Sequence, residues 1–177
     1  MNQKTIAIAV IVIIVIAVVG VGAYYLLSNP GEGGGNEPTP TPTATPTGVA
    51  DATSLEYSVE ITGGDSAGTY DFYAKNIGTA DLMIRLDIPL GDMNFTYIVN
   101  GAEQKAWANE GSGWTDLSST YQDQYDLWEP TYQGYVDQLA SWTSGDYTYT
   151  SGDATITISG IMLNPTLPDS LFQAPAA

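Results

Sequence analysis

The stretch "SSTYQDQYDLWEPTYQGYVDQLASW", residues 118–142, determines how the rest of the chain has to be arranged. Its large apolar side chains recur at alternating steps of four and three residues, which places them on one stripe of an α-helix. The stripe consists of Tyr121, Tyr125, Trp128, Tyr132, Tyr135, Leu139 and Trp142. Because such a stripe must be buried, the chain needs a second large apolar face on which it can pack.

A proline interrupts this helical pattern at position 130. Proline has no backbone N–H, and its ring clashes with the carbonyl group four residues earlier in a helix. Proline is also well suited to the first turn of a new helix. We therefore expect either two short helices or one sharply kinked helix around Pro130.

The partner face is predicted by stretches in which apolar and polar residues alternate. "LEYSVEIT" (55–62), "LMIRLDI" (82–88) and "MNFTYIV" (93–99) have the period of two that is typical of half-buried antiparallel strands. Further strands are expected near residues 69–75, 103–109, 146–150 and 154–163. Asn100-Gly101 is the strongest turn signal, and it predicts a type I′ hairpin in which both residues have positive φ.

These patterns together predict an α+β domain. Its sheet is expected to be a curved antiparallel meander, similar to half a barrel, that is covered on one face by a kinked or double helix. One transmembrane helix is expected to precede this domain.

The expected transmembrane helix is the uncharged apolar run "TIAIAVIVIIVIAVVGVGAYYLL", residues 5–27. A helix of this length crosses a hydrocarbon layer of about 30 Å. Lys4 precedes the run, while Tyr24 and Tyr25 lie at its far end, so residues 1–4 are expected in the cytoplasm and the rest outside. The alternative is a signal peptide cleaved at "VGA" (21–23), although the run is longer than the usual apolar region of about 7–15 residues.

A spacer follows, from residue 28 to residue 50. Its first part is rich in glycine, and "PTPTPTATPT" (38–47) is expected to be extended at roughly 3.1 Å per residue. The spacer would hold a folded domain, residues 51–177, away from the membrane surface.

Composition excludes several classes of function. The chain has 20 acidic and 4 basic residues, a net charge of -16, and neither cysteine nor histidine. A nucleic-acid partner is not expected because phosphates require a basic surface. Without Cys or His, the common metal sites, haem sites and catalytic triads lose their ligands and bases. We expect no cofactor, no metal site and no enzymatic activity.

Three stretches resemble a known family of proteins. They are "LMIRLDIP" (82–89), "YIVNGAEQKAWANEGSGWTDL" (97–117) and "GIMLNPTLPDSLFQAP" (160–175). Their order and turn residues are similar to those of the half-barrel outer-membrane lipoprotein carriers and their cell-envelope relatives. The resemblance implies an apolar cavity between sheet and helices that binds acyl chains. The chain departs from the family in being shorter, in its anchor, and in lacking a cysteine for lipid attachment.

From the resemblance we expect an apolar ligand, such as a lipid, to contact the aromatic stripe. The candidate cavity or rim residues are Tyr121, Tyr125, Trp128, Tyr132, Tyr135, Trp142 and, from the family's arginine before a proline, Arg85. The same rings can instead be core side chains that fill the space between helix and sheet. The alternative function is therefore a structural or adhesive cell-surface module with a fully packed core.

The sequence also predicts one modification site and a location. Asn94-Phe95-Thr96 is an N-glycosylation acceptor, and strand alternation points Asn94 toward solvent. The acidic surface, the single anchor and the spacer indicate a single-pass protein of the cell membrane, in an envelope of the archaeal kind, with its C-terminal domain outside the cell.

Overall fold

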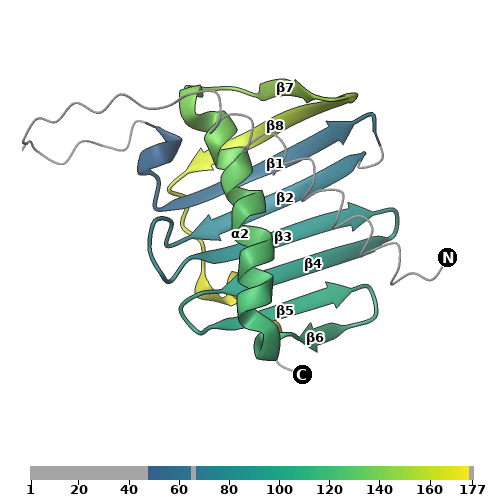
Figure 1. Cartoon of the computed structure of the whole chain (residues 1–177), viewed down its shortest axis with the longest axis vertical. Helices are drawn as coiled ribbons and strands as arrows, with labels where there is room; N and C mark the ends of the chain where they lie inside the picture. The colour runs from purple at the N-terminus through teal and green to yellow at the C-terminus, as the bar shows by residue number, and fades with distance from the viewer. Residues whose placement is uncertain (1–47, 65–66, 176–177) are drawn as a thin grey trace, which may run out of the picture.

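The computed structural model describes residues 48–64 and 67–175 of the chain. Within these residues, eight strands form one antiparallel sheet and one helix, α2 (Tyr121–Gln138), lies across it (Figure 1). The expected α+β class is therefore confirmed. The strands are β1 (Ser54–Thr62), β2 (Gly68–Lys75), β3 (Met83–Leu90), β4 (Met93–Asn100), β5 (Lys105–Glu110), β6 (Trp114–Asp116), β7 (Tyr147–Ser151) and β8 (Ala154–Leu163).

The order of the strands explains why a helix has to cross the sheet. The order is β6-β5-β4-β3-β2-β1-β8-β7, so the chain finishes a six-stranded meander at one edge and re-enters the sheet at the other. Eight strands spaced at about 4.8 Å span roughly 34 Å. The helical segment η2 (Ser118–Thr120), α2 and η3 (Leu139–Ser141) contains 24 residues and extends about 36 Å at about 1.5 Å per residue. Its length matches the distance it must cover.

The chain remains helical through Pro130, so the expectation of two short helices was wrong. Thr131 is fully buried, and its hydroxyl donates to the carbonyl of Leu127 at 3.1 Å. Trp128 and Tyr132, on either side of the proline, are both buried against the sheet. An interior proline costs a helix about 3 kcal/mol. Packing of the flanking rings offsets that cost and holds the helix in one piece.

The main core lies between α2 and one face of the sheet. Alternate residues of each long strand point into it, as the period of two predicted. On β1, for example, the inward side chains are Leu55, Tyr57, Val59 and Ile61, none more than 4% exposed. Val49, in the short 3₁₀ turn η1 (Val49–Asp51), also belongs to this core, so the packed body begins before Asp51.

The expected type I′ turn at Asn100-Gly101 was wrong, since neither residue has a positive φ. Asn100 ends β4, and the turn instead places Gln104 at a φ of 53°. Gly101 donates its N–H to the carbonyl of Leu82 at 3.0 Å. A Cβ atom at Gly101 would lie 2.5 Å from that same carbonyl oxygen. Glycine is required here by a close approach of backbone to backbone.

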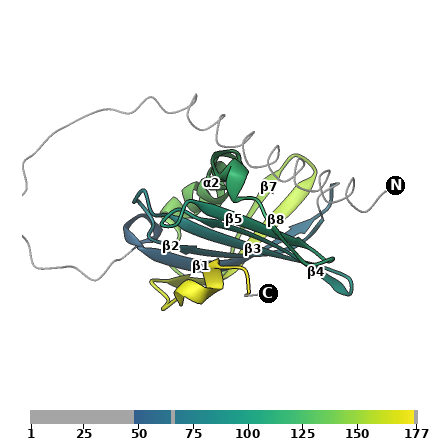
Figure 2. The same ribbon diagram turned by 90° about the horizontal axis from the view of Figure 1, so that it is seen from below.

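The opposite face of the sheet is partly covered by the last residues of the chain. We call Asn164–Gln173 the C-terminal strap; it includes the 3₁₀ turn η4 (Asp169–Phe172) and lies on the side of the sheet away from α2 (Figure 2). Phe172 is fully buried and packs with Leu167 against Met83 and Ile98 of the sheet. This second, smaller core was not predicted.

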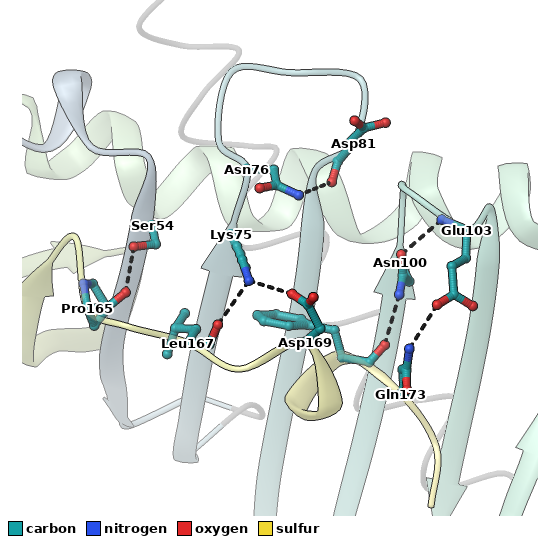
Figure 3. A network of polar contacts seen from close by, with 11 residues as sticks. Ser54, Lys75, Asn76, Asp81, Asn100, Glu103, Pro165, Leu167, Asp169 and Gln173 are labelled. Atoms are coloured by element: carbon teal, nitrogen blue, oxygen red, sulfur yellow. Dashed lines mark hydrogen bonds and ion pairs between the residues drawn. The ribbon is translucent and has the colours of Figure 1, made fainter. Parts of the chain in front are cut away.

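Polar contacts attach the strap to successive strands, and Figure 3 shows those from β1, β2 and β4. Each of β1, β2, β3 and β4 contributes at least one donor to a strap oxygen. The contacts are Ser54 Oγ to the Pro165 carbonyl (2.8 Å), Lys75 Nζ to the Leu167 carbonyl (3.0 Å) and to the Asp169 carboxylate, Arg85 Nη1 to the Leu171 carbonyl (3.0 Å), and Asn100 Nδ2 to the Phe172 carbonyl (3.2 Å). Backbone carbonyls that the irregular strap leaves without ladder partners are thereby satisfied.

The predicted anchor, residues 5–27, and nearly all of the predicted spacer lie outside the described residues. In the described part of the chain, no helix has the length and apolar character needed to span a membrane.

Candidate functional site

The aromatic stripe of α2 meets a second set of rings on the sheet. Trp128, Tyr132 and Tyr135 are each 2% exposed or less. Their positions on α2, at steps of four and three residues, direct all three side chains toward the sheet. We call the aromatic layer the set formed by these three residues with Tyr57 of β1, Phe72 of β2 and Tyr97 of β4.

Ring contacts within the aromatic layer are close. Tyr135 lies with its ring centroid 5.3 Å from that of Phe72 and 6.2 Å from that of Tyr57. Tyr57 and Phe72 stack at 5.2 Å, while Trp128 lies 5.0 Å from Tyr97. These separations fall within the 4.5–7 Å range of favourable aromatic pairs. The rings therefore pack on one another between helix and sheet, as core side chains do.

Two hydroxyl groups in the layer have no hydrogen-bond partner among the described residues. They belong to Tyr57, on the sheet, and Tyr132, on the helix, and both oxygens are buried. A buried hydroxyl without a partner costs about 1–3 kcal/mol. These two groups are the unsatisfied polar atoms of the layer.

Burial holds the phenols of the layer in their neutral form. The pKa of Tyr57 is raised well above its usual value, first by burial and then by the nearby Tyr132 and Tyr135. Burial is also the main cause of the raised pKa of Tyr132. Tyr149 of β7, beside the layer, has its pKa raised to about 12 by burial and by Tyr147. The layer thus presents neutral phenols.

The remaining helical candidates lie at the two ends of the crossing segment. Tyr121 and Tyr125 are half-buried at the start of α2, with ring centroids 6.0 Å apart. Trp142 follows η3, and its indole N–H donates to the carbonyl of Gly145 at 2.7 Å. Neither end belongs to the aromatic layer.

Arg85 lies on the opposite face of the sheet from the aromatic stripe. Its guanidinium pairs with Asp87 (Nε to Oδ2, 2.8 Å) and donates to the carbonyl of Leu171 in the C-terminal strap. Strand alternation explains this placement, because its neighbours Ile84 and Leu86 both point into the main core. Arg85 is thus not brought together with the aromatic candidates.

Asn94 is exposed on β4, opposite Pro89 of β3. The hydroxyl of Thr96, the third residue of the acceptor motif, is turned inward and donates to Asp87 Oδ1 at 2.6 Å. The exposure of Asn94 leaves room for a sugar, and glycosylation stays a prediction.

Within residues 48–64 and 67–175, no group of three His, Cys, Asp or Glu side chains is placed to hold a metal ion. The sheet residues of the aromatic layer were not predicted as site residues. The signal for them was present, since Tyr57 and Tyr97 occupy inward positions of the alternating strands.

Comparison with family models, with curated proteins and with solved structures gives no match to this chain.

The buried phenols lead to a prediction for alkaline pH. In the unfolded chain, tyrosines ionise near their usual pKa of about 10. In the folded chain the raised pKa values keep the phenols neutral, so stability that is complete below pH 10 is lost as the pH rises to about 12, the pKa of Tyr149. The phenolate absorbance of the buried tyrosines and the circular dichroism, followed together, should change in the same step. Ionisation of every tyrosine near pH 10 with the fold intact would contradict this.

The unpartnered hydroxyls give a second prediction. Tyr57→Phe and Tyr132→Phe should each raise the free energy of unfolding, by roughly 1 kcal/mol, because each removes a buried polar atom that has no partner. Urea unfolding measures the change. Tyr97→Phe is the matched control, since its hydroxyl donates to Glu110 at 3.4 Å and no gain is expected. A loss of stability in the first two variants would contradict this prediction.

Proposed function

We propose that the chain is a membrane-anchored protein whose outer domain is a non-catalytic structural or adhesive module of the cell surface. One observation carries this proposal: Trp128, Tyr132 and Tyr135 are all buried in the main core, and the rings of Trp128 and Tyr135 contact rings of the sheet. These rings occupy the place where a carrier-like protein would hold an acyl chain. A fully packed interior favours a domain that is displayed on the cell surface over a carrier domain that opens to bind a ligand.

The anchor and the spacer support the same proposal from the sequence. Residues 5–27 are long and apolar enough to span a bilayer, and residues 28–50 are rich in glycine, proline and threonine. A rigid body on an extended tether would project from the membrane into the surroundings. A sugar on the exposed Asn94 would suit the same location.

A second candidate is the binding of an apolar ligand, such as a lipid, by a half-barrel-like domain related to the lipoprotein carriers. The specific observation in its favour is the pair of unpartnered hydroxyls of Tyr57 and Tyr132. A ligand with a polar end could satisfy both if α2 moved away from the sheet. The half-buried Tyr121 and Tyr125 would then form the rim.

The two candidates differ in what a photoreactive fatty acid should label. The full chain, reconstituted in a bilayer that contains the probe, should give no adduct on the peptide spanning residues 121–138 if the interior is packed. Peptide mapping by mass spectrometry measures this. Adducts on Trp128 or Tyr132 that disappear when unlabelled fatty acid competes would overturn the first candidate in favour of the second. Adducts on residues 5–27 serve as the positive control for contact with lipid.

The absence of cysteine permits a clean test of topology. Single substitutions Asn2→Cys and Ala140→Cys, the second at an exposed residue after α2, introduce one thiol each. In intact cells a membrane-impermeant maleimide should label Ala140→Cys, and Asn2→Cys only after permeabilisation. The unmodified chain, which has no thiol, is the blank. The reverse pattern, or a mature chain in the medium that begins near Tyr24, would contradict the anchored topology.

A further inference from the structure

A β-bulge interrupts the pairing of β1 with β8. Glu56 pairs with Met162 and Ser58 with Ser159, so two residues of β8, Gly160 and Ile161, lie opposite one residue of β1. Gly160 has a φ of +62°, which glycine adopts without strain. A Cβ atom on Gly160 would meet nothing within 4 Å. The bulge therefore leaves an open space beside the sheet.

That space is a groove of about 520 Å³, which we call the bulge groove. Its walls come from β1, β2, β8 and the loop between η3 and β7. Side chains that matter for recognition are Glu56 of β1, Asp71 and Tyr73 of β2, and Trp142 and Asp146 of the loop. Three carboxylates and two aromatic rings thus border one cavity.

The aromatic wall is held in place before any ligand arrives. The indole N–H of Trp142 donates to the carbonyl of Gly145 at 2.7 Å, which fixes the ring relative to the loop. Tyr73 is half-buried between the groove and the smaller core under the C-terminal strap. Ordered rings reduce the entropy that a ligand loses on binding.

Among the described residues, the carboxylates of the groove have no basic partner. The ion pairs of the described residues lie elsewhere, at Lys75–Asp169, Arg85–Asp87 and Lys105–Glu103. None of them includes Glu56, Asp71 or Asp146. In a chain of net charge -16, the groove is left with uncompensated negative charge.

The pairing of β2 with β3 increases this charge. Asp71 lies directly opposite Asp87, and like charges at such positions destabilise a sheet. Asp87 is compensated by Arg85, whereas Asp71 accepts a hydrogen bond from the Ser58 hydroxyl, at 2.5 Å, and has no ion pair within the described part of the chain. This negative charge also affects the nearby Tyr73. The pKa of its phenol is raised first by burial and then by Asp71, Glu56 and Asp87. A cation in the groove would relieve the repulsion.

The residues that line the groove determine which kind of cation it can bind. No group of three His, Cys, Asp or Glu side chains in the described chain is placed to hold a metal ion. Aromatic faces attract organic ammonium groups by cation–π contact. We propose that the bulge groove binds a small organic ammonium cation, with Glu56, Asp71 and Asp146 supplying charge and Trp142 and Tyr73 supplying aromatic faces.

The test is calorimetric titration of the full chain, in nonionic detergent at low salt, with spermidine. Saturable binding with a stoichiometry of one is expected. The variant Asp71→Asn with Asp146→Asn should weaken it by about tenfold or more. The control, Asp81→Asn with Asp123→Asn, removes the same charge at exposed positions away from the groove and should weaken it by less than about twofold. If the first variant fails to fold, Asp146→Asn alone, in an exposed loop, replaces it.

Competition separates an organic site from general attraction to an acidic surface. Tetramethylammonium, which contacts aromatic faces but forms no hydrogen bond, should displace spermidine, and Mg²⁺ at equal ionic strength should not. Equal weakening in the two double variants would overturn the proposal. Equal displacement by Mg²⁺, or an absence of saturable binding, would do the same.

Discussion

The structure depends on one geometric constraint: a single helical segment has to carry the chain from one edge of the sheet to the other. The sheet ends at β6 on one side and resumes at β7 on the other, so every intervening strand must be crossed. A segment that spans the sheet in this way presents one face to it along its whole length. That face must be apolar, which is why the large side chains of residues 121–142 keep to one stripe. The aromatic layer follows directly from the crossing.

The regular parts of this arrangement were predictable from sequence because they repeat. Alternation located β1, β3 and β4 within one or two residues, and the helical stripe located α2. The three-residue β6 was missed because it is too short to show a period. Pro130 was misleading because local propensity favours a break there, whereas the burial of Trp128 and Tyr132 on either side favours continuity.

Features that depend on contacts between distant residues were less predictable. By local rules Gly101 indicates a tight turn. Glycine is required at this position, however, because the carbonyl oxygen of Leu82 lies so close that a Cβ atom would clash with it. The C-terminal strap contains no periodic pattern, and only the fold shows that Phe172 has a cavity to fill on the second face. For the candidate site, the helical stripe correctly placed Trp128, Tyr132 and Tyr135 next to one another. Arg85 lies on the other face of the sheet, because side chains alternate between the two faces along β3. The bulge had one visible signal, a glycine inside the strand pattern at residue 160.

The C-terminal strap has a consequence for the order in which the protein matures. Chain synthesis supplies β1 to β4 first, but the residues that cover Met83 and Ile98 are made only after β8. The outer side of β1 likewise stays unpaired until β8 is complete. A chain interrupted before residue 154 would therefore present both an apolar patch and an open strand edge, which are features that chaperones and proteases recognise. The ten residues of the strap thus cover the apolar patch only in a chain that extends through them.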